Sequence, residues 1–290
     1  MTNGIAPPVL SLEGRRALVT GGGTGLGKAC ATALAAAGAA VTICGPDSAV
    51  LEAACVAMGA MDLHNVKAVT ADVTDEAQVA AAVDAAAVGG VLHIAVANAG
   101  VALPGSLLHI GAEHWMGPLG VNVLGTAHTI KHAALAMREE GGSIITISSI
   151  ASTRPAAFMS TYSVSKAAVD ELTRVAAAEL GRFGIRVNGI RPGWMRTETV
   201  EATTDEKNLA TIRRETPLAT DAPLGQLGDP DDVARAVVYL AADYSSWITG
   251  QLLGVCGGSS LPPPSGDFAH IARLLFAEDM ARDFGTPEAQ

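Results

Sequence analysis

Short apolar runs alternate with longer segments of helical periodicity along most of the chain. We expect strands at residues 17–20, 40–44, 67–71, 93–97, 143–148, 186–190 and 252–256. We expect the intervening helices at residues 26–37, 49–58, 76–88, 113–138, 162–180 and 230–242. Strands that alternate with helices are typical of βαβ units, whose parallel sheet is buried on both faces. Because such crossovers are right-handed, the pattern predicts an α/β fold: a Rossmann-type, doubly wound seven-stranded parallel sheet with helices on both faces.

The same pattern predicts a single domain over residues 1–258, because no internal repeat or linker divides the strands. The segment at residues 195–228 is a polar, charged insert. In this architecture it leaves the sheet at the carboxyl end of a strand, where ligands bind, so we expect a lid. The extension at residues 259–290 contains three prolines at 262–264, and its later apolar spacing predicts one helix. That helix covers a pocket of its own or a neighbouring subunit, or it braces the surface; the sequence leaves both interpretations open.

Composition and charge exclude several function classes. Hydrophobic residues make up 49% of the 290 residues and charged residues 17%, which excludes disorder. The net charge of −10 lacks the basic field that nucleic acid or an anionic membrane requires. The four cysteines form no C-x-x-C pair and the first residues show no secretory signal, so we expect reduced thiols in a cytoplasmic protein.

A glycine-rich segment directly follows the first predicted strand. Residues 21–27 read Gly-Gly-Gly-Thr-Gly-Leu-Gly and lead into an alanine-rich helix. Glycines allow a tight turn and a close approach to a pyrophosphate, which lies at the positive N-terminus of a helix. The spacing G-x-x-x-G-x-G differs from the G-x-G-x-x-G fingerprint of other dinucleotide folds. We therefore predict phosphate binding by residues 21–27 because they lie between the first strand and the first helix, and not because of their spacing.

Residues 20–27, together with the Asn98–Ala99–Gly100 step after the fourth predicted strand, resemble the classical short-chain dehydrogenase/reductase (SDR) family. The resemblance covers residues 12 to 258, with a departure at Ala97, where the family often has asparagine. It implies an NAD(P)-dependent oxidoreductase that assembles as a homotetramer or dimer. Asn98 also has a purely structural interpretation, as a turn-former that stabilises the central strand.

Tyr162 and Lys166 are four residues apart and share one face of a predicted helix. A free phenol has a pKa of about 10, so it is almost fully protonated at neutral pH. A nearby ammonium group favours the phenolate, and lowering that pKa by about 3 requires about 4 kcal/mol. We therefore expect Tyr162 to exchange a proton with a substrate oxygen. An isolated Y-x-x-x-K match would instead indicate an exposed helix pair.

The resemblance assigns four catalytic residues: Asn122, Ser149, Tyr162 and Lys166. Ser149 would hydrogen-bond the substrate oxygen, and we prefer it to Ser148 because alternation along a strand points the two side chains to opposite faces. Asn122 would hold a water in a proton relay through the lysine. The structural alternative for Asn122 is a helix-distorting residue bonded to backbone.

The resemblance also supplies the residues that contact the cofactor. Asp72 and Val73 would lie against the adenine, although they also suit a helix cap. Pro192, Gly193 and Thr197 would hold the nicotinamide carboxamide. The complete set is Gly21, Thr24, Gly25, Leu26, Gly27, Asp72, Val73, Asn98, Ala99, Gly100, Tyr162, Lys166, Pro192, Gly193 and Thr197.

The end of the second predicted strand bears on the choice between NAD and NADP. An acid there bonds the ribose 2′-hydroxyl, whereas an arginine attracts a 2′-phosphate. NAD-preferring members of the family usually have aspartate where this chain has Gly45, and NADP-preferring members often have a basic residue where it has Pro46 or Thr24. Asp47 lies close enough to bond the hydroxyl, or it caps the next helix. Because none of these positions has a basic side chain that could bind the 2′-phosphate of NADP, we prefer NAD as the cofactor.

The predicted pocket residues Phe158, Met159, Trp194 and Met195 are large and apolar. They favour a hydrophobic secondary alcohol or ketone, steroid-like or acyl-like, as the substrate, unless they pack the lid or a subunit contact. The main alternative to an enzyme is a non-catalytic dinucleotide-binding sensor or scaffold of the same fold.

His128 and His132 are four apart on a helix, a spacing that metals can use. With no third ligand apparent, we expect a polar helix face and no metal.

Overall fold

The computed structural model describes residues 10–197, 222–224 and 227–261. Its strands form one parallel sheet in the order β3-β2-β1-β4-β5-β6-β7. Their bounds are β1 Arg16–Thr20, β2 Ala40–Gly45, β3 Val66–Thr70, β4 Ile94–Ala97, β5 Gly142–Ile147, β6 Ile185–Pro192 and β7 Leu252–Val255. The chain starts in the middle of the sheet, and β1 pairs with both β2 and β4. The carboxyl ends of β1 and β4 therefore form the point where the winding reverses and where ligands bind in open α/β sheets.

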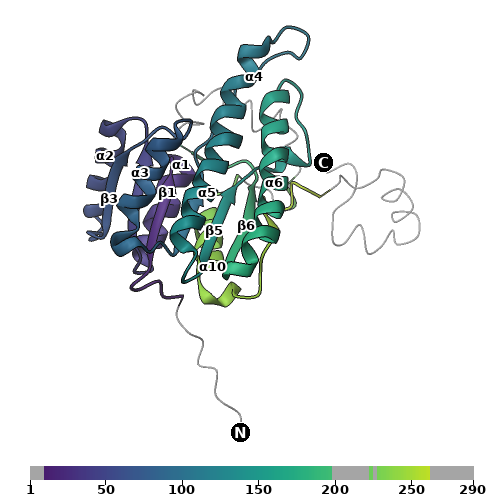
Figure 1. The fold of residues 1–290 in the computed structure, drawn as a ribbon. Coiled ribbons are helices and arrows are strands. Elements are labelled where there is room, and N and C mark those ends of the chain that lie inside the picture. Colours follow the sequence, from purple (N-terminus) through teal and green to yellow (C-terminus); the bar gives the residue numbers. More distant parts are fainter. Residues whose placement is uncertain (1–9, 198–221, 225–226, 262–290) are drawn as a thin grey trace, which may run out of the picture.

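Helices cover both faces of this sheet (Figure 1). The principal helices are α1 Gly25–Ala36, α2 Ser48–Gly59, α3 Glu76–Ala86, α4 Ala112–Pro118, α5 Gly125–Met137, α6 Ser160–Leu180 and α10 Pro230–Ala241. The short helical segments are η1 Val88–Gly90, η2 Leu119–Leu124, η3 Ile150–Ser152, η4 Gly181–Phe183 and η5 Asp243–Ser245.

Two hydrophobic clusters fix which helix covers which face. Cys30 of α1, Met58 of α2 and Val237 of α10 belong to one cluster, which includes side chains such as Ile43 and Ile145 of the strands. Side chains of α3, α5 and α6 belong to the other cluster, together with alternate residues of the same strands. The inner strands are apolar at nearly every position because both of their faces are buried. This confirms the predicted doubly wound sheet.

The helix predicted at residues 113–138 is the one clear error in the element prediction. The structure divides it into α4, the π-helical segment η2 and α5. Pro118 ends α4, since proline cannot donate the backbone hydrogen bond that an α-helix needs at that position. Apolar periodicity continues across this interruption, so it gave no sign of the change in helix type.

The predicted tail helix, and the lid apart from residues 195–197, 222–224 and 227–228, lie outside the described residues. All four cysteines are free thiols, and Cys30 and Cys44 are buried. Within the described ranges, no helix combines the length and the apolar character needed to cross a membrane.

Candidate active site

The glycine-rich segment forms a cradle at the N-terminus of α1. Its N-cap, Thr24, has an extended backbone and makes no side-chain capping hydrogen bond, and the first turn contains no acidic residue. The backbone N–H groups of that turn therefore remain available to an anion. Gly21 has a φ of +64°, and a Cβ on Gly27 would overlap the Gly21 carbonyl oxygen. Glycine at these two positions keeps the cradle open, which fits the pyrophosphate of a dinucleotide.

Asn98 ties the end of β4 to this cradle. Its Nδ2 donates to the carbonyl oxygens of Thr20 and Gly21, at 2.9 and 3.2 Å. The Thr20 hydroxyl in turn accepts from the backbone N–H groups of Asn98 and Ala99, at 3.0 and 3.1 Å. Asn98 thus has the structural role that the sequence left open, and Ala99 is held directly beside the cradle.

Asp72 and Val73 lie beyond the end of β3. The Asp72 carboxylate accepts from the backbone N–H and the hydroxyl of Thr74, at 2.9 and 2.8 Å. The helix cap that the sequence also allowed here is provided instead by Asp75, whose carboxylate accepts from the first N–H groups of α3. Asp72 closes a turn, and Val73 is buried beneath it.

The residues predicted to hold the nicotinamide carboxamide follow β6. The Gly193 N–H donates to the Val255 carbonyl oxygen at 2.9 Å, which fixes the segment beside the end of β7. Thr197 reaches the cradle, because a Cβ on Gly25 would lie 3.6 Å from the Thr197 Cγ2. Met195 is buried in a core cluster, where its Sδ packs against Gly228, so it does not belong with the predicted pocket lining.

Ser148 and Ser149 at the end of β5 have different partners, as alternation along a strand requires. The Ser148 hydroxyl donates to the Lys166 carbonyl oxygen at 3.1 Å. The Ser149 hydroxyl lies near enough to the Tyr162 phenol to lower its pKa, and it accepts from the Ala151 N–H at 3.1 Å. Only the second of these serines is placed beside the phenol.

Tyr162 and Lys166 lie on the buried face of α6. The Lys166 Nζ lies 5.7 Å from the centroid of the Tyr162 ring and donates to the Ile147 carbonyl oxygen at 2.8 Å. Burial lowers the pKa of Lys166 to about 8, and the charge of Asp170 opposes this effect. Burial raises the pKa of Tyr162, and the hydrogen bond from Ser149 acts against that rise.

The sequence predicted that Lys166 lowers the pKa of Tyr162, whereas in this structure the pKa of Tyr162 is raised. Removing the phenol from water penalises the phenolate more than the surrounding groups stabilise it. The site holds its tyrosine as a protonated phenol.

Asn122 lies in the π-helical segment η2 and is fully buried. Its Oδ1 accepts from the Val101 N–H at 2.8 Å, and its Nδ2 donates to the Val101 carbonyl and to the Ser165 hydroxyl, at 2.9 and 2.8 Å. A Cβ on Gly100 would lie 3.3 Å from both the Asn122 Oδ1 and the Lys166 Nζ. Asn122 is thus bonded to backbone within a distorted helix, as its structural alternative required, and it adjoins the lysine; its role in a proton relay stays a prediction.

Two features of this region were missed from the sequence. Ser165 donates to the Tyr162 carbonyl at 2.7 Å while it accepts from Asn122, so it links α6 to η2. Asp170 forms a buried ion pair with Arg191, Nη2 to Oδ2, at 2.7 Å. Asp170 has the same helical spacing from Lys166 as Lys166 has from Tyr162, and this signal was available in the sequence.

The structure also shows the contacts of Asp47, His128 and His132, for which the sequence allowed both a functional and a structural interpretation. Asp47 caps α2, accepting from the N–H groups of Ala49 and Val50. His128 Nδ1 is 3.0 Å from the Val73 carbonyl oxygen, and His132 Nε2 is 3.1 Å from Glu76 Oε1. No group of three or more His, Cys, Asp or Glu side chains in the described ranges is arranged to hold a metal ion.

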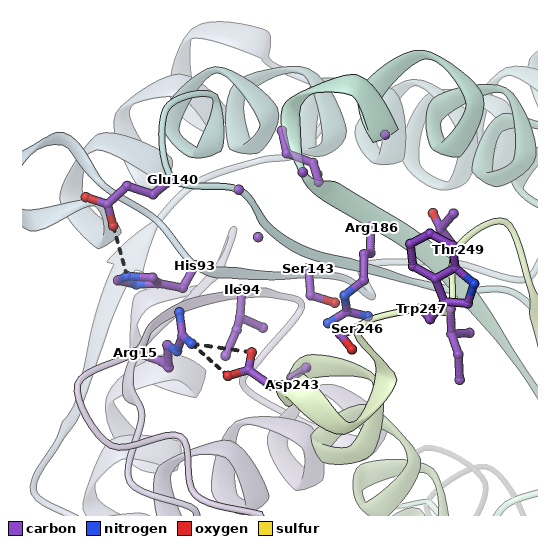
Figure 2. A pocket seen from close by; sticks show the side chains of 17 residues that line it. Arg15, His93, Ile94, Glu140, Ser143, Arg186, Asp243, Ser246, Trp247 and Thr249 are labelled. Atoms are coloured by element: carbon purple, nitrogen blue, oxygen red, sulfur yellow. Dashed lines mark hydrogen bonds and ion pairs between the residues drawn. The ribbon is translucent and has the colours of Figure 1, made fainter.

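A cavity of about 640 Å³ lies at the opposite edge of the sheet, at the amino ends of β4, β5 and β6 (Figure 2). Its charged groups are already partnered. Arg15 pairs with Asp243 at 3.2 Å, and Arg186 donates to the Leu240 carbonyl oxygen at 2.9 Å, at the end of α10. None of the predicted site residues lines this cavity.

The comparisons with known proteins agree with this arrangement. A family model described as "Enoyl-(Acyl carrier protein) reductase" matches residues 21–260. The chain is 40% identical over 255 residues to cis-4-hydroxycyclohexanecarboxylate dehydrogenase of Sinomonas cyclohexanicum, covering 84% of this chain and 96% of that protein. It is 35% identical over 260 residues to (3R)-3-hydroxyacyl-CoA dehydrogenase of Mus musculus, covering 86% of this chain and 97% of that protein.

A short-chain type dehydrogenase/reductase from Mycobacterium ulcerans has a similar structure, with a TM-score of 0.80 and 37% identity. The match covers 94% of this chain and 99% of that one. The chain belongs to the short-chain dehydrogenase/reductase family and is a nicotinamide-dependent oxidoreductase of its alcohol dehydrogenase type.

Proposed function

We propose that the protein interconverts a hydrophobic secondary alcohol and its ketone, with Tyr162 as the general acid and base. The observation that carries this proposal is the placement of the Ser149 hydroxyl beside the Tyr162 phenol, on the face of α6 that also buries Lys166. These three side chains lie at the carboxyl edge of the sheet, the same edge as the cradle at α1. A nicotinamide dinucleotide bound there supplies or accepts the hydride at the substrate carbon.

The pKa directions support a role for Tyr162 in ketone reduction. The phenol is held protonated, so it can donate its proton to the oxygen of the ketone as negative charge develops there. Ser149 donates a second hydrogen bond to the same oxygen. Lys166, whose pKa is about 8, is mostly an ammonium at neutral pH and stabilises the phenolate that remains. In alcohol oxidation, the same proton moves back to Tyr162.

The choice of a hydrophobic substrate rests on the loops around this edge. Leu103 and Leu107 after β4, Phe158 before α6, Leu224, and Leu261 after β7 are all large, apolar and exposed. Two of these loops are joined directly, because the Gly105 N–H donates to the Phe158 carbonyl oxygen at 2.8 Å. A rim of this composition favours cyclic or acyl-chain ketones over polyols. The two relatives named above act on a ring-borne hydroxyl and an acyl-chain hydroxyl, as their names state.

We also propose NAD rather than NADP as the cofactor. Asp47 uses its Oδ1 to cap α2, yet its negative charge remains exposed just beyond β2, where it opposes a 2′-phosphate. We expect NADH to raise the melting temperature more than NADPH at equal concentration. Asp47→Asn keeps a cap for α2 but removes the negative charge. We expect this variant to show a smaller difference between the melting-temperature shifts with NADH and with NADPH. A larger thermal shift with NADPH would contradict the proposal.

Tyr162→Phe separates an enzyme from a non-catalytic binding protein. We expect the variant to bind the reduced cofactor as the parent does, but to reduce ketones about 100- to 10,000-fold more slowly. The panel contains a cyclic ketone, a 3-oxoacyl thioester and a ketose, and Tyr244→Phe at the amino edge serves as the control. Full turnover by Tyr162→Phe would rule out the assigned proton donor. Highest turnover with the ketose would rule out the hydrophobic substrate. Self-association and cytoplasmic location stay predictions.

A further inference from the structure

Tyr162, Lys166 and Asp170 form a row along α6, each one helical turn from the next. Lys166 is 4% exposed and Asp170 is 3% exposed, so two opposite charges are buried on the same helix face. An unpaired buried ammonium is strongly disfavoured, and a buried carboxylate one turn away offsets that penalty.

Asp170 is itself held from the neighbouring strand. Its Oδ2 accepts from both Nε and Nη2 of Arg191 on β6, at 2.9 and 2.7 Å. Its Oδ1 is buried and has no hydrogen-bond partner among the described residues. Arg191 therefore holds the Asp170 carboxylate through one oxygen only. The other oxygen of Asp170 leaves part of the negative charge free to act on Lys166.

The charges around Lys166 come from few elements. On α6 the titratable neighbours are Tyr162 and Asp170, and behind Asp170 lies Arg191 of β6. The groups placed near Nζ from other elements are the Ile147 carbonyl of β5 and, around Gly100, the Asn122 amide of η2, and both are uncharged. Asp170 thus provides the negative charge that opposes the effect of burial on Lys166.

We propose that Asp170 is a positioning residue for the proposed reaction, which keeps Lys166 in its ammonium form, while Arg191 holds the Asp170 carboxylate against β6. Arg191 directly precedes Pro192 and Gly193, the segment assigned to the nicotinamide. The ion pair therefore joins the lysine-bearing helix to the strand end that carries this segment. The proposal rests on the proposed function of Lys166, but the charge of the lysine can be measured without a substrate.

The first test is a pH titration of the lysine side chains by NMR in the full-length protein with 13C-labelled lysine. The chain has five lysines, and Lys166→Met identifies the relevant signal. We expect Asp170→Asn to lower the pKa of Lys166 by about 1, which is a tenfold change in its charge ratio. The control is Glu171→Gln, which removes an exposed carboxylate from the same helix and leaves that pKa unchanged. An unchanged Lys166 titration in Asp170→Asn would overturn the proposal.

The second test is the pH profile of ketone reduction. We expect kcat of Asp170→Asn to stay within about twofold of the parent at pH 6 and to fall about fivefold to tenfold at pH 8, because the neutral lysine becomes dominant earlier. A loss of the same size at both pH values would indicate a purely structural role and contradict the proposal. A parent protein without activity would remove the proposed function, yet the NMR titration would still decide whether Asp170 sets the charge of Lys166.

Asp170→Asn leaves Arg191 as an uncompensated buried charge, which can prevent folding. The double variant Asp170→Asn/Arg191→Gln removes both charges of the ion pair. It replaces the single variant in both tests if Asp170→Asn does not fold. The double variant is expected to lower the Lys166 pKa in the same direction but by less than Asp170→Asn, because a positive charge is lost together with the carboxylate.

Discussion

The two edges of the sheet contain similar polar groups but use them differently. At the amino edge, Arg15 pairs with Asp243, and Arg186 donates to backbone carbonyls at the end of α10. At the carboxyl edge, the first N–H groups of α1 have no side-chain cap, and Lys166 is buried with a lowered pKa. The described cavity lies at the amino edge, next to Trp247, which is 99% exposed.

This difference shows that a cavity is a weaker sign of function than buried or uncapped polar groups that are available to a ligand. The amino edge resembles an ordinary protein surface, where charges meet partners and contribute little. The carboxyl edge holds a buried ammonium, whose removal from water costs free energy, and a helix N-terminus whose N–H groups have no side-chain cap. Groups maintained at such a cost are the ones to examine for chemistry.

After Tyr162→Phe, the largest effect is expected from the serine pair at the end of β5. Ser149→Ala removes the hydroxyl beside Tyr162 and its hydrogen bond to the substrate oxygen, so kcat falls about 100- to 1,000-fold. Ser148→Ala removes only a bond to the Lys166 carbonyl and is expected to keep kcat within about threefold. Steady-state reduction assays compare the two variants. Equal losses would mean that the wrong serine has been assigned.

A smaller effect is expected from glycines at the two edges. A Cβ on Gly27 would overlap the Gly21 carbonyl oxygen, so Gly27→Ala displaces the cradle and weakens NADH binding at least about tenfold. A Cβ on Gly181, at the amino edge, meets no atom within 4 Å, so Gly181→Ala leaves binding unchanged. Fluorescence titration with NADH measures both. Comparable affinities would show that the cradle does not hold the cofactor.

The smallest effect concerns His93 at the amino edge. Burial, with the charges of Arg16 and Arg15, lowers the pKa of His93, and its Nδ1 accepts from the Arg16 N–H at 3.0 Å. The unfolded chain therefore binds the proton more readily. The contribution of the neutral ring to stability is complete above about pH 6.5 and is lost as the pH falls below it.

Replacing His93 by Gln keeps an acceptor for the Arg16 N–H but removes the titration. Between pH 7.5 and 5.5 we expect the melting temperature of the parent to fall about 2 °C more than that of His93→Gln. His109→Gln, an exposed position on the loop after β4, provides the comparison from the other edge. An equal fall in melting temperature for the parent and His93→Gln would show that His93 has the same pKa in the folded and the unfolded chain, which contradicts the prediction.

Burial on both faces made the sheet predictable, because it leaves continuous apolar runs at the inner strands. The observed strands begin and end within two residues of their expected positions. Helical spacing also predicted that Tyr162 and Lys166 share one face of a helix, whereas their catalytic role came from the resemblance to the family and stays a prediction. Spacing alone did not reveal the protonation state of Tyr162, because that depends on how deeply the phenol is buried.

Other features depended on tertiary contacts that no local pattern encodes. Met195 looks like a pocket residue in sequence, but it packs into the core against Gly228. Ser165 acquires its role only because η2 places Asn122 within hydrogen-bond distance. The interruption between α4 and α5 left the apolar periodicity intact, so its only sign in the sequence was Pro118.

That interruption has a consequence for comparing this chain with its relatives. A π-helical turn accommodates one residue more than an α-helical turn. Deleting one residue between Leu119 and Leu124 would allow a regular helix, and every side chain on one side of the deletion would rotate by about 100° relative to the other. Asn122 would then lose Val101 or Ser165 although its identity was preserved. A relative that lacks this extra residue therefore cannot carry the same asparagine in the same place, however well the letters align.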